Sequence, residues 1–187
     1  REGQAFVPKG DTVLQTGDIL YLTGAAEEFR KSFKKLKMPV KPLQSVMISG
    51  GGRISYYLAE VLIKQGAKVT LIEKNQGIAN EISAAISKAV VMCDDTLAYF
   101  DSMSGTDIDH TDAFIAMTEN DEYNLIAAMY AESQGINKVV SRINNKSRLK
   151  VLQPGSRICT ISREDVAADR ILGYSRSLLN AEDNDAV

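Results

Sequence analysis

The sequence has few of the residues on which disulfide frameworks, metal sites and histidine-based catalysis depend. It contains two cysteines, Cys93 and Cys159, and one histidine, His110. The cysteines form no CxxC pair and have no histidine cluster near them, so neither a disulfide framework nor a zinc site is expected. This cysteine usage is typical of a reducing cytoplasm, where we expect the protein to reside.

Long apolar runs and an excess of basic residues are missing too. No segment approaches the roughly 18 apolar residues that a membrane span requires. Lysine and arginine total 22 against 24 aspartates and glutamates, which gives a net charge of −2 and a pI near 5.5. This balance does not support nucleic-acid binding. With 44% hydrophobic residues, the composition is instead typical of a soluble globular protein.

The usual catalytic motifs are absent as well. The sequence has no G-x-S-x-G elbow, no H-E-x-x-H pair and no Walker A motif. A dehydrogenase needs a proton donor or acceptor beside its cofactor, but His110 precedes an expected strand and so falls at the wrong end of a parallel sheet. We therefore expect the protein not to be an enzyme. The alternative is a fragment of an NAD-dependent oxidoreductase that lacks its substrate domain.

The first 37 residues predict a small α+β unit. The chain begins at Arg1 without methionine or a targeting segment, as expected for a piece of a longer protein. A helix is expected at 27–37, with an apolar face and a basic face that is expected to be solvated, the alternatives being anionic lipid or an acidic partner. Strands are expected at three short apolar runs, residues 4–7, 12–14 and 19–22. Such a unit is too small to bury a core alone.

A proline-containing linker at 38–43 separates this unit from a larger α/β domain at 44–179, which a polar tail at 180–187 follows. Apolar runs alternate with helical periods, which predicts a Rossmann-like, doubly wound parallel sheet of six strands. The expected strands are 45–49, 68–72, 89–92, 112–117, 138–142 and 157–160. The expected helices are 53–65, 76–87, 95–103, 120–134, 145–152 and 163–179.

A triple glycine follows the first strand of this domain. Gly50, Gly52 and Ser55 match the G-x-G-x-x-G/A spacing, and the loop leads into a helix whose N-terminal N–H groups favour an anion. Glu73 ends the second strand, 23 residues after Gly50, where an acid can bind ribose hydroxyls. These features together predict a nucleotide site that prefers a ligand without a 2′-phosphate. The alternative is a glycine turn with a capping acid.

Other polar residues follow the carboxyl ends of the strands. Arg53 lies beside the glycine loop and either contacts a diphosphate or points into solvent. Arg142 ends the fifth strand and pairs either with phosphate or with a neighbouring acid. The polar residues after the third and fourth strands can cap helices or touch the ligand, with capping favoured. The predicted cofactor-binding residues are Gly50, Gly52, Arg53, Ile54, Glu73, Lys74, Asp94, Asp95, Thr118 and Arg142.

In combination, five segments resemble the TrkA-N domain, also called RCK or KTN, of potassium-uptake regulatory subunits. They are residues 47–54, 69–73, 112–118, 121–124 and 140–144, and the resemblance covers about residues 43–178. Residues 1–37 likewise resemble the end of a TrkA-C domain, with Pro8 to Thr12 and Gly17-Asp18 as its turns.

This resemblance implies a cytosolic subunit, peripheral at the inner face of the cell membrane, that gates a Trk-type potassium-translocating membrane subunit. It also implies binding of NAD(H), or of ATP or ADP, and a homo-oligomer formed through the TrkA-N domain and the last helix. The alternative role for the last helix is to cover the sheet of its own chain. Carried over to this sequence, Gly50, Gly52 and Arg53 would hold the diphosphate, Glu73 the ribose and Arg142 a phosphate, while Asp94 and Thr118 would line the cleft.

Three residues depart from the family pattern around this site. Ser55 replaces the third glycine, Cys93 stands where glycine is usual, and Asp95 stands where a small residue is common. Because of these three departures, the affinity of the site for a nucleotide and the nucleotide that it prefers stay open.

Overall fold

The computed structural model describes residues 7–16, 26–37, 42–103, 108–153 and 155–184. Contacts divide the chain into two units, residues 1–42 and 43–187. In the first unit, helix α1 (Ala26–Lys35) forms where the sequence predicts a helix. The rings of Phe29 and Phe33 stack on it, with centroids 6.3 Å apart.

The prediction of a strand at residues 12–14 is wrong. A turn forms before it, with the N–H of Thr12 bonded to the carbonyl of Lys9 at 3.0 Å, and residues 12–15 then have no regular structure. Residues 4–6 and 19–22 of the other two expected strands lie outside the described residues.

The second unit contains a six-stranded parallel sheet in the order β3-β2-β1-β4-β5-β6, which confirms the doubly wound fold. Its strands are β1 (Ser45–Ser49), β2 (Lys68–Ile72), β3 (Val90–Met92), β4 (Ala113–Ala116), β5 (Lys138–Arg142) and β6 (Cys159–Ile161). The order reverses beside β1, which pairs with both β2 and β4. Ligands of open parallel sheets bind outside the carboxyl ends of the strands at such a switch point.

The helices are α2 (Arg53–Lys64), α3 (Gln76–Ala85), α4 (Thr96–Ser102), α6 (Asp121–Ser133), the 3₁₀ helix η1 (Lys146–Val151) and α7 (Arg163–Asn184). Two expectations need correction. The helix predicted at 145–152 is a 3₁₀ helix, and the last helix continues five residues past 179, into the segment expected to be a loose tail.

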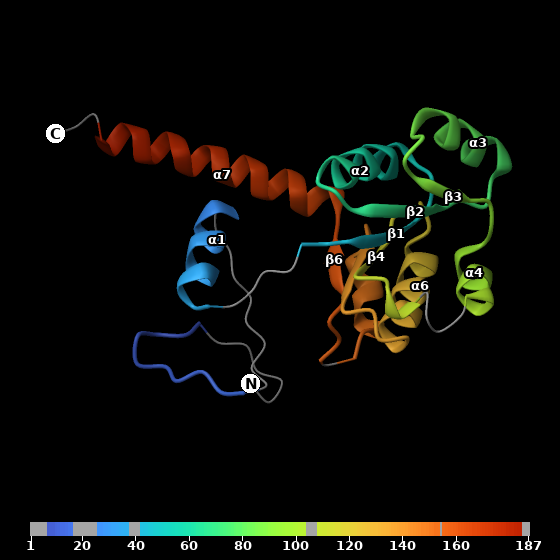
Figure 1. The fold of residues 1–187 in the computed structure, drawn as a ribbon. Helices are drawn as coiled ribbons and strands as arrows, with labels where there is room; N and C mark the ends of the chain where they lie inside the picture. Colours follow the sequence, from blue (N-terminus) through green and yellow to red (C-terminus); the bar gives the residue numbers. More distant parts are fainter. Residues whose placement is uncertain (1–6, 17–25, 38–41, 104–107, 154, 185–187) are drawn as a thin grey trace. The chain divides into compact units, whose positions relative to one another are not determined.

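The helices cover both faces of the sheet, with α2 and α3 on one face and α4 and α6 on the other (Figure 1). Alternate residues of β1 point to opposite faces, so that Ile48 packs with α2 and α3 while Met47 packs with α4 and α6. Ala127, Ala128 and Ala131 of α6 are fully buried, and their small side chains let this helix lie close to the sheet. None of the described helices is both long and apolar enough to cross a membrane.

Candidate functional site

The glycine loop between β1 and α2 has a backbone that other residues would distort. Gly50 has φ of 97°, and a Cβ there would lie 3.1 Å from the backbone of Thr118. A Cβ on Gly51 would approach side-chain atoms of Ile82, Ile78 and Glu73 to 3.0 Å or less. The second glycine therefore lets the loop pack tightly against α3.

Gly52 differs from its two neighbours because a Cβ there would enter open space. It is the N-cap residue of α2 and supplies no side-chain hydrogen bond to the first turn. The N–H groups of that turn are therefore left to another acceptor, as at the phosphate-binding N-termini of nucleotide-binding folds.

Glu73 follows β2 and is bound to backbone on both sides of its carboxylate. Its Oε2 accepts from the N–H of Gly51 at 2.6 Å, and its Oε1 accepts from the N–H of Asn75 at 2.7 Å. The acid predicted to bind a ribose therefore also fixes the glycine loop to the end of β2.

The residues after β3 are held mostly by capping bonds. Asp95 is the N-cap of α4 and accepts from Leu97 N at 3.0 Å, which confirms the capping interpretation for this residue. The Tyr123 hydroxyl accepts from the N–H of Thr96 at 3.0 Å. Burial, and next the hydrogen bond with Asp95, raises the pKa of Tyr123. These bonds tie the start of α4 to α6.

Asn124 joins two of the loops around the site, and sequence reasoning missed it. Its side chain is fully buried. Its Oδ1 accepts from the N–H and the hydroxyl of Thr118 at 2.9 and 2.6 Å, and its Nδ2 donates to the carbonyls of Thr118 and Arg142 at 3.0 and 2.9 Å. One amide thus sets the position of the residues that end β4 and β5.

Arg142 is a cation buried at the edge of the site. The residue is 8% exposed, and its Nε is buried with no hydrogen-bond partner among the described residues. The neighbouring acid considered as an alternative partner is not found among the described residues. Arg53, in contrast, is exposed at the start of α2.

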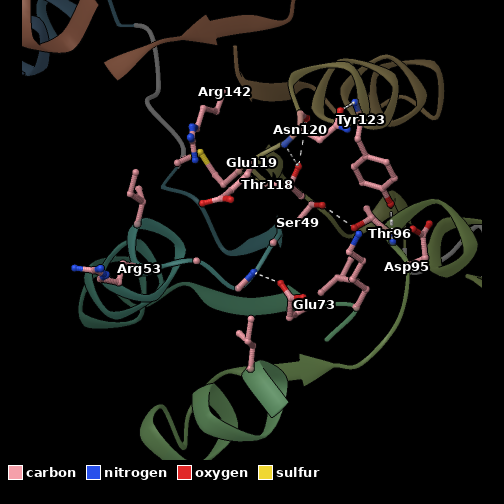
Figure 2. A pocket seen from close by; sticks show the side chains of 18 of the residues that line it. Ser49, Arg53, Glu73, Asp95, Thr96, Thr118, Glu119, Asn120, Tyr123 and Arg142 are labelled. Atoms are coloured by element: carbon pink, nitrogen blue, oxygen red, sulfur yellow. Dashed lines mark hydrogen bonds between the residues drawn. The ribbon is translucent and has the colours of Figure 1, made fainter. Parts of the chain in front are cut away.

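One cleft of about 830 Å³ lies at the carboxyl ends of the strands (Figure 2), lined by the glycine loop, Glu73, Asp95, Tyr123 and the two arginines. All ten predicted site residues lie on its wall. Within the described part of the chain, no group of three metal-binding side chains is present. The cleft residues that the sequence analysis did not select are Ser49, Gly51, Ile72, Ile78, Thr96, Met117, Glu119, Asn120, Tyr123 and Arg163.

Several of these missed residues carry a signal in the sequence. Gly51 is the middle residue of the triple glycine, and Ser49 and Ile72 are the last residues of strands whose ends were predicted correctly. Arg163 is harder to find because it follows a short edge strand, whose expected end was misplaced by one residue.

Comparison with known proteins places these features in a family. The model of the TrkA-N domain matches residues 46–159. The Trk system potassium uptake protein TrkA of Vibrio alginolyticus is 32% identical over 176 residues, and that of Halomonas elongata is 27% identical over the same length. Each alignment covers 94% of this chain, which spans 38% of the length of each of these relatives.

Solved structures support the fold. The NAD(P)-binding domain of an exopolyphosphatase-related protein from Archaeoglobus fulgidus superposes with a TM-score of 0.57 at 14% identity, covering 72% of this chain and 98% of that domain. A xanthine dehydrogenase from Bacillus halodurans superposes with a TM-score of 0.51 at 12% identity, covering 74% of this chain and 44% of the dehydrogenase. At these identities the likeness concerns the fold alone.

Proposed function

Because the chain belongs to the TrkA-N domain family, we propose that it is the nucleotide-binding part of a regulatory subunit of a Trk-type potassium uptake transporter. The proposed ligand is NAD(H), with ATP and ADP as competitors for the same cleft. The proposed partner is the potassium-translocating membrane subunit, which the protein meets at the inner face of the cell membrane. Residues 1–37 are proposed to be the end of a TrkA-C domain.

One observation carries the proposal: among the residues that the structure describes, the cleft combines an uncapped helix N-terminus with a buried cation whose Nε has no partner. In the described part of the chain, the first turn of α2 has no side-chain cap and Arg142 Nε has no acceptor. Buried charged groups are normally paired, and a diphosphate provides acceptors for both features. The residues present therefore fit a nucleotide.

Each residue has a distinct task in this proposal. The N–H groups that follow the glycine loop would bind the diphosphate, and Gly52 would leave room for its close approach. Glu73 would accept hydrogen bonds from the ribose hydroxyls, while Arg53 and Arg142 would neutralise phosphate charge. NAD(H) carries hydride in dehydrogenases, but here binding itself would act as the signal.

Regulation requires the nucleotide to bind two states of the assembly with different affinities. We propose that these states are arrangements of a homo-oligomer formed through the TrkA-N domain and α7. The exposed apolar side chains of α7, including Val166 and Leu172, support this role.

Calorimetric titration with NADH, NAD, ATP and ADP tests the ligand. The variant Gly52→Ala should keep the stability of the parent, because its Cβ enters open space, but should weaken nucleotide binding at least about tenfold by blocking close approach. Gly10→Ala is the matched control, since a Cβ there also meets nothing and Gly10 does not line the cleft.

Absence of binding at millimolar concentration for all four nucleotides would refute the proposal. Equal affinity of the Gly52→Ala variant and the parent would place the ligand elsewhere. Oxidation of NADH with a small carbonyl compound would support the oxidoreductase alternative instead.

A further inference from the structure

Helix α1 and the turn that follows it carry a charge opposite to that of the rest of the chain. Residues 26–37 contain five basic and two acidic side chains, which gives this segment a net charge of +3. The whole chain has a net charge of −2, so the remaining residues together carry −5. A local excess of this sign attracts anionic surfaces to this segment and not to the rest of the protein.

The lysines of α1 gather on one face of the helix. Lys31, Lys34 and Lys35 stand at positions i, i+3 and i+4, a spacing that places their side chains next to one another, and all three are exposed. In the described part of the chain they form no ion pair. The helix dipole favours the two lysines of the last turn, but the repulsion of Lys31 by both is not offset. We call these three lysines the basic face of α1.

The opposite side of the same helix is apolar and only partly covered. Phe29, Phe33 and Leu36 follow one another at i, i+4 and i+7, and the N–H of Leu36 bonds to the carbonyl of Ser32 at 2.9 Å, so the helical winding reaches Leu36. The two phenylalanines are half-buried, and Leu36 is 67% exposed. We call these three residues the apolar face of α1. A helix of a globular unit normally buries such a face.

The combination of the two faces favours a lipid surface over an acidic protein. A helix with lysines on one side, phenylalanine and leucine on the other, and low overall hydrophobicity has the pattern of helices that lie in the plane of a membrane interface. The apolar stems of lysine let the ammonium groups reach lipid headgroups while neighbouring apolar side chains enter the acyl boundary. An acidic protein would use the charge of α1 but would not require the exposed Leu36.

We propose that α1 binds the surface of an anionic lipid bilayer, with its basic face at the headgroups and its apolar face toward the acyl chains. The inference goes beyond the proposed nucleotide site and concerns the first unit. It rests on the proposed function only for location, because a protein that acts at the inner face of the cell membrane has such a surface within reach. Lipid contact would then hold the protein at the membrane without the membrane subunit.

Co-sedimentation of the full chain with lipid vesicles tests this proposal. One set of vesicles contains phosphatidylcholine alone, and the other contains equal parts of phosphatidylcholine and phosphatidylglycerol, with no membrane protein in either. We expect binding to the anionic vesicles to be at least about tenfold tighter than to the neutral ones. It should weaken as the salt concentration rises from about 50 to about 300 mM, because salt screens the lysines.

Three variants assign the binding to α1. The double variant Lys34→Gln/Lys35→Gln should weaken binding to anionic vesicles roughly 20-fold, on the order of fivefold for each lysine. Lys64→Gln/Lys68→Gln is the matched control, since it removes the same charge from two exposed lysines of α2 and β2 and should change binding less than about threefold.

Leu36→Ser tests the apolar face without disturbing a buried residue, and it should weaken binding about three- to tenfold by removing an inserted side chain. Circular dichroism and thermal melts verify that all variants are folded.

Equal binding of the parent to both kinds of vesicle would overturn the proposal, and so would a Lys34→Gln/Lys35→Gln variant that binds as tightly as its control. Soluble polyglutamate is the probe for an acidic protein partner. If it binds the parent as tightly as the anionic vesicles do, and Leu36→Ser changes neither, the surface belongs to such a partner and the lipid proposal fails. Vesicle binding is measured without nucleotide, so its failure is distinguishable from a failure of the proposed function, which the nucleotide titration tests.

Discussion

Asn124 is the side chain with the most hydrogen bonds around the cleft. Its amide is fully buried and forms hydrogen bonds with three atoms of Thr118 and with the carbonyl of Arg142. Because an amide supplies both a donor and an acceptor, no isosteric residue can replace all of these bonds.

We predict that Asn124→Asp lowers the free energy of unfolding by about 2 to 4 kcal/mol, because it removes two N–H donors and buries a carboxylate. Urea unfolding at neutral pH measures the effect. Asn80→Asp is the control, since Asn80 is exposed and only accepts a bond from Gln76. A similar loss in both variants would contradict a special role for Asn124.

At the residue scale, the sequence predicts those site residues that follow a local rule. Gly50, Gly52 and Glu73 could be selected because spacing after a strand identifies them. Asn124 follows no such rule, because its bonds reach the ends of two other segments. The position of Arg163 at the cleft depends on the pairing of β5 with β6, which no local sequence pattern predicts.

The helices α4 and α6 are joined by tyrosine hydroxyls. Tyr123 of α6 accepts from the N–H of Thr96, and Tyr130 donates to Asp101 Oδ1 at 2.7 Å. Burial first, and then the bond with Asp95, raises the pKa of Tyr123. The folded state therefore favours the protonated phenol.

This linkage gives a pH prediction. The stabilisation due to Tyr123 is fully present below the unfolded tyrosine pKa of about 10 and is lost as the pH rises through the folded value. The Tyr123→Phe variant should lose about 1 kcal/mol at pH 8, because Thr96 N–H loses its acceptor, but should be less sensitive to alkali than the parent.

Urea unfolding at pH 8 and above pH 10 checks both effects. Tyr57→Phe is the control, since Tyr57 is exposed on α2 and its ring contact with Tyr56 remains. Parallel pH profiles for the parent and Tyr123→Phe would show that Tyr123 is not responsible.

At the element scale, every strand of the sheet was predicted, with ends within two residues, because each is a short apolar run between turn residues. The sequence analysis expects a helix at residues 145–152 but does not predict that it is the 3₁₀ helix η1. Its start is fixed by tertiary bonds, since Asp121 accepts from the N–H groups of Asn144 and Asn145 at 2.9 and 2.7 Å. A helical period shows that a segment turns, but not how tightly it winds.

At the scale of the whole molecule, α7 is an element whose apolar residues are exposed. Val166 and Leu172 are 56% and 52% exposed. An exposed apolar face is an expected sign of a contact with another surface, and a second copy of the chain would cover these side chains.

We predict that the protein self-associates through α7 and that Leu172→Glu shifts it toward monomer, because a charge in an apolar contact is unfavourable. Sedimentation velocity over a range of concentrations measures this. Val151→Glu is the control, since Val151 is similarly exposed on η1. A parent that stays monomeric at its highest soluble concentration would contradict the prediction.

The two backbone bonds of Glu73 affect whether an acid at this position can be used to infer nucleotide binding in a related protein. An acid at this position is useful even without a ligand, because it ties the glycine loop to the end of β2. Evolution can therefore retain the acid in a chain that has stopped binding nucleotide. Arg142 has no comparable side-chain bond in the described structure, so a relative's loss or retention of this arginine is the better marker of a working cleft.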